Sequence, residues 1–123
     1  MLQGREILAL YKLLSGKSTL SFDDERRYVL RLRAVNAGLA AVFGIMEEGR
    51  LVSSASVSSM NDKYAVIADV FSDEGYRCRG LARRCLMSAV GFSLSRGRIP
   101  VLLCDEKMCS YYEKAGFVIY GKM

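Results

Sequence analysis

Hydrophobic residues recur at helical spacing in the N-terminal third of the chain. Residues 4–15 carry apolar side chains at i, i+3, i+4 and i+7, namely Ile7, Leu10, Tyr11 and Leu14. This spacing predicts a helix that ends at Gly16. A hydroxyl residue followed by acids within residues 21–24 marks the start of a second helix, because such side chains favour helix N-termini. The second apolar stripe consists of Tyr28, Leu32, Val35 and Leu39, and residues 36–38 supply a C-terminal stop.

After Gly38 the pattern changes to short apolar runs joined by polar turns. The runs cover residues 39–46, 51–60 and 64–71. The turns between them are Glu-Glu-Gly-Arg at residues 47–50 and Asn-Asp-Lys at residues 61–63. Short links between apolar runs predict three antiparallel strands.

The C-terminal half alternates between the two periods. We predict a helix over residues 80–95, a strand over 99–104, a helix over 105–115 that ends at Gly116, and a last strand over 117–120. A meander followed by β-α-β-α-β gives an α/β fold with a mixed sheet.

Composition agrees with one globular domain covering residues 1–123. Apolar residues make up 51% of the chain and charged residues 25%. No apolar run approaches the ~18 residues of a membrane-spanning helix, and no signal peptide opens the chain, so we expect a cytoplasmic protein. The chain has no histidine, which excludes Ser-His-Asp triads and histidine-based zinc sites.

The cysteines predict no metal centre. Cys78, Cys85, Cys104 and Cys109 are separated by six and four residues within each pair, not by the two of a CxxC motif. In a cytoplasmic protein they are expected to be reduced, buried and without a function.

The net charge of +5 is concentrated in one stretch. Between Gly75 and Cys104 there are six arginines and no acid: Arg77, Arg79, Arg83, Arg84, Arg96 and Arg98. Such a run predicts an anionic partner, which could be a phosphorylated cofactor, a nucleic acid or a membrane surface. The alternative is a solvated surface.

The segment Arg77-Cys-Arg-Gly-Leu-Ala82 joins a predicted strand to a predicted helix. A helix N-terminus offers free N–H groups and a positive dipole end, and Gly80 allows close backbone approach. A pyrophosphate fits such a place, with Arg77 and Arg79 as further contacts and Arg83 or Arg84 at another phosphate. A surface loop before an arginine-rich helix is the competing interpretation.

Two motifs together resemble the GNAT acetyltransferase superfamily. Arg77, Gly80 and Ala82 match its Arg/Gln-x-x-Gly-x-Gly/Ala loop, with Tyr76 before it. Its Tyr-Glu-Lys-x-Gly-Phe signature is matched by Tyr112, Glu113, Lys114, Gly116 and Phe117. The sequence departs from the family where Asp105 replaces an asparagine and Met108 an alanine. The Leu-x-Cys-acid opening with paired tyrosines looks more like the arylalkylamine-type branch.

The resemblance covers about residues 39–120 and implies a mostly antiparallel twisted sheet flanked by helices, here without the first and last family strands. It implies acetyl-CoA as cofactor and direct attack by an amine. Pantetheine would lie along the fourth family strand, at Asp69, Val70, Phe71 and Ser72. The pyrophosphate would lie on Arg77, Cys78, Arg79, Gly80, Leu81 and Ala82, and Arg83 and Asp105 complete the predicted cofactor site.

The resemblance also implies catalytic roles. Tyr112 matches the tyrosine that protonates the leaving thiolate, which suits a phenol because its pKa is close to that of a thiol. The alternative is that Tyr112 packs as a helix-face aromatic, although Tyr111 is the expected core partner. Asp69, inside an apolar strand, either faces the cleft as the general base or is exposed on the other face. Asp73 and Glu74 are expected to be solvated turn acids.

The predicted partner is a small-molecule or peptide amine, with no nucleic acid and no membrane. A homodimer through a sheet edge would supply the missing strand pairing. Two other classes remain as alternatives. One is a degenerate coenzyme A-binding domain without catalysis, which Asp105 and the missing strands suggest. The other is a basic nucleic-acid-binding module, against which the absence of an exposed aromatic series argues.

Overall fold

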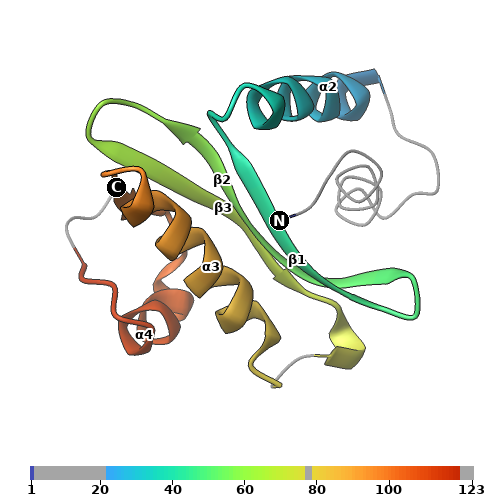
Figure 1. Cartoon of the computed structure of the whole chain (residues 1–123). Helices are drawn as coiled ribbons and strands as arrows, with labels where there is room; N and C mark the ends of the chain where they lie inside the picture. The colour runs from blue at the N-terminus through green and yellow to red at the C-terminus, as the bar shows by residue number, and fades with distance from the viewer. Residues whose placement is uncertain (2–21, 77–78, 120–123) are drawn as a thin grey trace.

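A computed structural model describes residue 1, residues 22–76 and residues 79–119 (Figure 1). The helix predicted over residues 4–15 lies outside the described residues. The described elements are α2 (Phe22–Asn36), β1 (Ala41–Glu47), β2 (Arg50–Met60), β3 (Tyr64–Ser72), a 3-10 turn η1 (Glu74–Tyr76), α3 (Leu81–Ser95), β4 (Ile99–Val101) and α4 (Glu106–Lys114).

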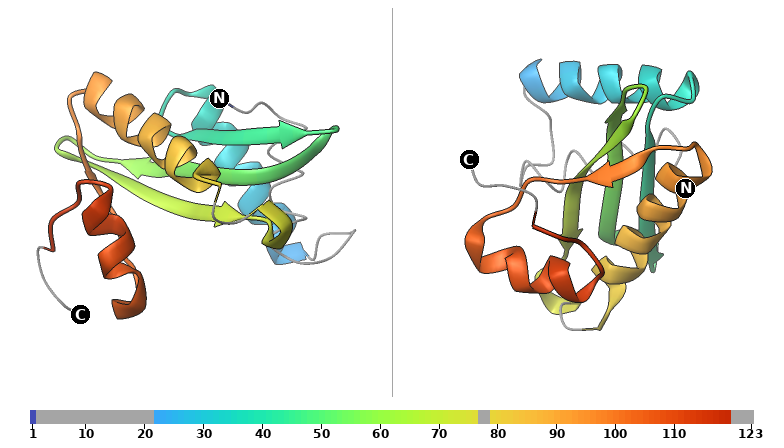
Figure 2. Two further views of the ribbon diagram at one scale, coloured as in Figure 1. Left: turned by 90° about the horizontal axis from the view of Figure 1, so that it is seen from below. Right: turned by 90° about the vertical axis from the view of Figure 1, so that its left-hand side faces the viewer.

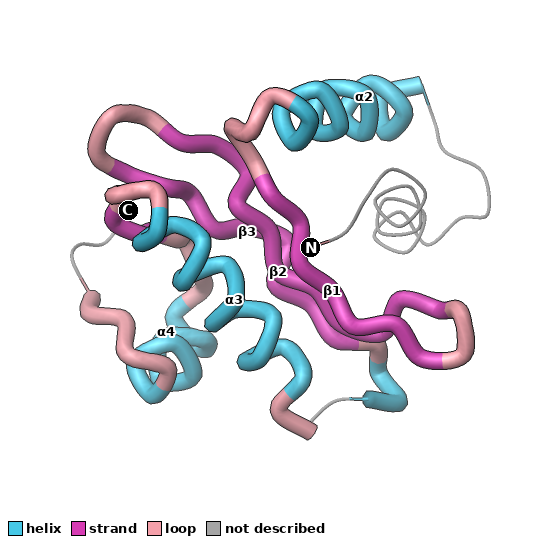
Figure 3. The backbone as a smooth tube through the Cα atoms, viewed as in Figure 1, coloured by secondary structure: helices cyan, strands magenta, loops and turns pink. Residues whose placement is uncertain are grey.

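The four strands form one sheet in the order β1-β2-β3-β4. The first three strands are antiparallel, and β4 pairs with β3 in parallel. The α2 and α3 helices cover opposite faces of the sheet, which Figure 2 shows from two further directions. The α4 helix lies beside α3 (Figure 3). This mixed, mostly antiparallel sheet flanked by helices confirms the predicted fold class.

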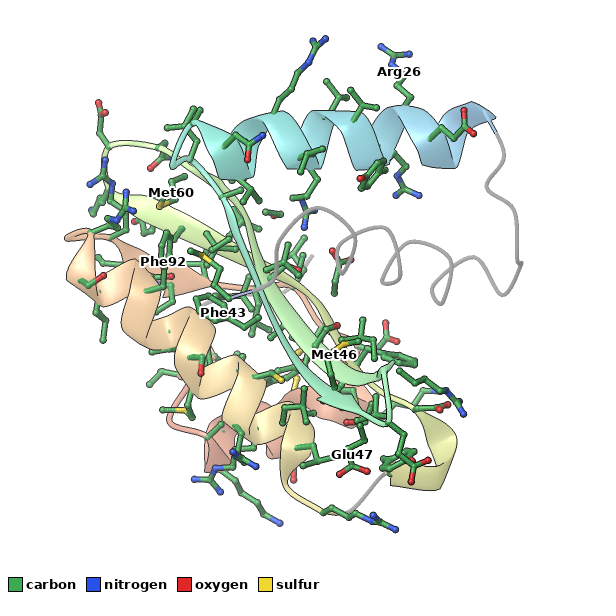
Figure 4. All side chains as sticks on the ribbon, turned by 45° about the vertical axis from the view of Figure 1, so that its right-hand side comes forward. Arg26, Phe43, Met46, Glu47, Met60 and Phe92 are labelled. Carbon is green, nitrogen blue, oxygen red and sulfur yellow. The ribbon has the colours of Figure 1, made fainter. Side chains whose placement is uncertain are left out.

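The main core lies between the sheet and α3. Its buried members are Ala55, Val57, Ala65, Ile67, Cys85, Leu86 and Ala89. At its edge, Phe43 of β1 meets Phe92 of α3 edge-to-face with ring centroids 5.9 Å apart (Figure 4). A smaller apolar cluster under α2 contains Val42 and Leu51, packed by Tyr28, Leu32 and Val35. Three members of the predicted apolar stripe therefore face the sheet, whereas the fourth, Leu39, lies beyond α2 and is exposed. Arg26 points away from the sheet (Figure 4).

Both predicted hairpin turns are confirmed, and local chemistry explains them. Glu48 and Gly49 both have positive φ, 52° and 75°, which is the backbone that a tight two-residue hairpin turn requires. In the second turn the Asn61 Oδ1 accepts hydrogen bonds from the backbone N–H groups of Lys63 and Tyr64, at 2.9 and 2.7 Å. Such an Asx turn reverses the chain without help from distant residues.

The prediction of a last strand over residues 117–120 is wrong for the described residues 117–119. The backbone N–H of Phe117 donates to the carbonyl of Tyr112 at 3.0 Å, and Gly116 has φ of 104°. Both features belong to a helix C-cap, so the first residue of the expected strand is instead part of the end of α4. The strand predicted over residues 99–104 is also shorter, since pairing ends at Val101.

No helix in the described part of the chain is both long and apolar enough to cross a membrane.

Candidate functional site

The two central strands of the predicted site separate soon after they meet. β3 and β4 pair at three positions, Tyr64 with Ile99, Ala65 with Pro100 and Val66 with Val101. β3 then continues to Ser72, and no strand among the described residues pairs with it on that side. The backbone of the second half of β3 is therefore an open edge, to which an extended ligand can add hydrogen bonds as a strand would.

A β-bulge lies in this open half of β3. Ser56 of β2 pairs with Ala68, but Ser54 pairs with Phe71, so β3 holds one residue more than β2 over the same interval. Asp69 within this interval has φ of 54°, an uncommon left-handed conformation for a residue other than glycine. Bulges bend a strand and re-aim its side chains, and they are common near active sites.

Serine hydroxyls support the bulge from β2. The Ser54 Oγ donates to the carbonyl of Asp69 and the Ser53 Oγ to the carbonyl of Phe71, both at 2.8 Å. Both serines are fully buried. The hydroxyls thus satisfy carbonyls that lie in the irregular part of the ladder and would otherwise lack a partner. Ser56 Oγ is also buried, and among the described residues it has no hydrogen-bond partner.

The bulge directs Asp69 toward α2. Its Oδ2 accepts a hydrogen bond from Arg31 Nη1 at 3.2 Å, and the two side chains are 25% and 13% exposed. Neither expectation for this carboxylate, an unpaired group in the cleft or an exposed one, describes its partly buried ion pair. The sequence pattern missed Arg31 because it lies 38 residues away in the chain.

The other predicted strand residues lie along the open edge of β3. Val70, Phe71 and Ser72 are all partly buried. Val70 packs against the α3-side core, and the Ser72 Oγ lies 3.0 Å from the Ser53 Oγ. Asp73 forms an ion pair with Arg50 and is not a free turn acid.

The N-terminus of α3 follows β3 after the η1 turn. Gly80 caps it with φ of 74°, and the first helical bond runs from Arg84 N–H to the Gly80 carbonyl at 3.1 Å. The N–H groups that precede Arg84 in the helix have no acceptor within it. No acid lies in the first turn, and no side chain among the described residues caps it. A Cβ at Gly80 would meet nothing within 4 Å, so the approach is open. These features fit the phosphate of a cofactor.

The arginine-rich stretch divides into two groups. Arg96 and Arg98, at the far end of α3, donate to the backbone carbonyls of Gly38 and Asn61 at 3.1 and 2.8 Å. These hydrogen bonds stabilise the contact between the end of α3 and two distant turns. Arg83 and Arg84 are exposed at the start of α3 and border a cavity of about 650 Å³ that extends toward β1.

Arg79 directly precedes Gly80, the N-cap of α3. Arg79 stacks over the ring of Tyr76, with 5.1 Å from its guanidinium carbon to the ring centroid. Arg77 and Cys78 lie outside the described residues. Leu81 and Ala82 form the first turn of α3 and are partly buried.

The paired tyrosines of α4 have different neighbours. Both pack against the α3-side core, and Tyr112 also contacts Phe117 with ring centroids 6.0 Å apart. Burial raises the pKa of Tyr112, and its neighbours Tyr111 and Cys104 raise it further. Burial also raises the pKa of Tyr111, an effect that the positive charge of Arg83 opposes. The pKa of Tyr111 therefore depends on a residue of α3, whereas the pKa of Tyr112 depends on a residue of the segment before α4.

That segment ends at Asp105, which caps α4 with extended backbone (φ −69°, ψ 154°). Its carbonyl accepts the Met108 N–H at 2.9 Å, but its carboxylate makes no cap hydrogen bond. The exposed carboxylate lies between the end of β4 and the tyrosines.

The prediction of buried cysteines is correct only for Cys85 among the three whose positions are described. Burial raises the pKa of its thiol. Cys104 is exposed and Cys109 is half-buried, because both lie at the solvent-facing start of α4. No group of three or more His, Cys, Asp or Glu residues in the described ranges could hold a metal ion.

Comparison with known proteins identifies a family and a relative that match most of the chain. The model of the acetyltransferase (GNAT) family matches residues 7–117. A glucosamine 6-phosphate N-acetyltransferase of Trypanosoma brucei brucei is 35% identical, over 85% of this chain and 71% of the relative.

Solved structures give the same fold. The crystal structure of a Trypanosoma brucei acetyltransferase has a TM-score of 0.73 and 28% identity, covering 99% of this chain and 92% of its own. A predicted acetyltransferase of Clostridium acetobutylicum, solved with acetyl-CoA, has a TM-score of 0.79 at 14% identity and covers 99% and 90% of the two chains. At that identity the likeness concerns the fold alone.

Proposed function

Because the chain belongs to the GNAT family of acetyltransferases, we propose that it transfers the acetyl group of acetyl-CoA to a primary amine by direct attack. The observation that carries the proposal is the open edge of β3, followed along the chain by the N-terminus of α3, whose cap Gly80 provides no side-chain hydrogen bond. The edge of residues 69–72 that faces away from β2 suits an extended amide-containing arm, and the first turn of α3 suits a pyrophosphate. Acetyl-CoA supplies an acetyl thioester, the activated group that the amine attacks.

We assign the general acid to Tyr112. Its raised pKa keeps the phenol protonated through neutral pH and up to at least its ordinary value near 10. In the part of the chain that the structure describes, its hydroxyl has no hydrogen-bond partner, so its proton is available to a leaving thiolate. A phenol that is protonated at neutral pH can donate its proton to a thiolate.

We assign the role of general base to Asp69, which lies in the open second half of β3. The bulge and the Arg31 guanidinium fix the direction of its carboxylate. In this role it accepts a proton from the substrate ammonium, directly or through a water molecule, so that the free amine can attack. The competing role is purely structural, an ion pair that fastens α2 to β3.

The first prediction concerns the acceptor. The name of the trypanosomal relative suggests an amino sugar phosphate, whereas the residues before α4 suggest an arylalkylamine. We expect release of free coenzyme A from acetyl-CoA with glucosamine 6-phosphate and not with tryptamine. N-acetylglucosamine 6-phosphate, which has no free amine, is the control. If acetyl-CoA raises the melting temperature but no amine in a broad panel is acetylated, the chain is a degenerate cofactor-binding domain.

The second prediction tests the phosphate position with a charge-matched pair at Gly80. Asn and Asp both tolerate positive φ and have equal size, so Gly80→Asn and Gly80→Asp differ mainly in charge. A negative charge is stabilising near a helix N-terminus, so without ligand the Gly80→Asp variant should be at least as stable as the Gly80→Asn variant. It should nevertheless bind acetyl-CoA about tenfold more weakly, a difference of about 1.4 kcal/mol measured by calorimetry. Equal affinities would refute the assignment of the phosphates to this turn.

The third prediction separates the two tyrosines of α4. Tyr112→Phe should lower kcat by about a hundredfold or more, with little change in acetyl-CoA affinity, because it removes only the proton donor. Tyr111→Phe is the matched control, since it removes a hydroxyl from a neighbouring, equally half-buried ring. It should keep kcat within about twofold of wild type. A wild-type kcat for Tyr112→Phe would contradict the acid role.

The fourth prediction tests Asp69. Asp69→Asn keeps the shape of the side chain and should lower kcat by about a hundredfold. Asp73→Asn is the control, because it alters another ion-paired carboxylate at the end of the same strand. Melting temperatures of both variants separate lost chemistry from lost folding. If Asp69→Asn melts earlier but turns over normally, Asp69 serves only the ion pair with Arg31.

A further inference from the structure

Two thiols meet at the start of α4. The Sγ atoms of Cys104 and Cys109 lie 3.9 Å apart, and the Cys109 Sγ also lies 3.8 Å from the carbonyl oxygen of Asp105. Cys104 is exposed and Cys109 half-buried, so both can be reached from solvent. The third cysteine with a described position, Cys85, is buried in the α3-side core.

Helix geometry explains why these thiols meet. Asp105 is the N-cap of α4, so Cys104 is the residue before the cap and Cys109 is the fourth residue of the helix. Side chains at these two positions contact each other across the first turn, usually as an apolar pair that fixes the direction in which the chain enters the helix. Here the contact is made by two sulfur atoms that can bond covalently.

The pair adjoins two residues that are assigned to the proposed site. Asp105, between the two cysteines, is a predicted cofactor contact, and the Cys104 thiol is close enough to Tyr112 to raise its pKa. Joining the sulfurs would shorten their separation from 3.9 Å to about 2.05 Å. The segment after β4 would then be tied to the first turn of α4, and the position of Asp105 would change.

We propose that Cys104 and Cys109 form a reversible intrachain disulfide on exposure to a peroxide, and that this bond lowers acetyl-transfer activity. The effect on activity rests on the function proposed above, whereas the bond itself does not. The Cys104 thiolate attacks one peroxide oxygen, which gives a sulfenic acid and, after protonation of the leaving oxygen, one water. The Cys109 thiolate then attacks the Cys104 Sγ and displaces the hydroxyl as a second water. Overall, two thiols are oxidised and one hydrogen peroxide is reduced to two waters.

The local environment sets the conditions of the test. Partial desolvation, the contact with Cys109 and the negative charge of Asp105 raise the pKa of Cys104. Because the thiolate is the reacting form, oxidation should be faster at about pH 8.5 than at neutral pH.

The full-length protein is treated with hydrogen peroxide, blocked with iodoacetamide and digested with trypsin without reductant. Lys107 lies between the two cysteines, so trypsin separates residues 99–107 from residues 108–114. In the oxidised protein these two peptides should remain joined, and dithiothreitol should separate them. Cys104→Ser and Cys109→Ser should each abolish the joined peptide. A joined pair with Cys78 or Cys85, a disulfide between two chains on a non-reducing gel, or sulfinic acid at Cys104 without a joined peptide would each overturn the proposal.

Activity supplies the second measurement. Oxidised wild type should lose at least about tenfold in acetyl transfer, because a displacement of 1 Å in a reacting arrangement can cost about a hundredfold. Dithiothreitol should restore the activity. Cys109→Ser should have wild-type activity before peroxide and keep it afterwards. If the joined peptide forms but activity is unchanged, the regulatory part is wrong. If untreated protein acetylates no amine, the proposed function fails, and the joined peptide alone decides whether the disulfide exists.

Discussion

The candidate site depends on the limited pairing between β3 and β4. After three residue pairs β4 ends, whereas β3 runs on for six more residues. If β4 continued alongside β3, its backbone would form hydrogen bonds with the groups on the outer side of β3 that now have no strand of the described chain beside them. The separation of the two strands thus exposes part of the edge of β3, which is otherwise an inner strand of the described sheet. The first turn of α3 follows this edge along the chain, and its leading N–H groups have no acceptor within the helix.

The serine-rich sequence of β2 can be understood from the same feature. A bulge removes backbone groups from the regular ladder, and buried groups without partners are costly. Ser53 and Ser54 lie opposite the bulge and donate to the carbonyls of Phe71 and Asp69. A larger apolar residue at either position would supply neither the hydrogen bond nor the small volume. The hydroxyls in this strand are therefore part of the support of the site.

Features that depend on neighbouring residues can be predicted from the sequence, whereas features that depend on residues far apart in the chain cannot. The turns at Glu48–Gly49 and Asn61 depend on their own residues and were predictable. The last strand was not, because Gly116 and Phe117 complete the C-cap of α4 by a bond to Tyr112. The Arg31–Asp69 ion pair joins elements that no periodicity connects. The six-arginine run was uniform in sequence, yet Arg96 and Arg98 bind carbonyls of distant turns, while Arg83 and Arg84 stay exposed. Folding thus divides a patch that composition alone presents as one.

The start of α4 shows how one local geometry can serve two purposes. The residue before a helix cap and the fourth residue of the helix often pack against each other, and an apolar pair there would also fix the direction of the helix. With sulfur at both positions, the same contact gains a reversible covalent state. The x4 spacing of Cys104 and Cys109 resembles no metal or CxxC motif, so its meaning depends on knowing that the helix begins between them, at Asp105. Because Cys104 is close enough to Tyr112 to raise its pKa, the proposed bond at this helix entrance would lie next to the proposed general acid and would need no long-range transmission through the sheet.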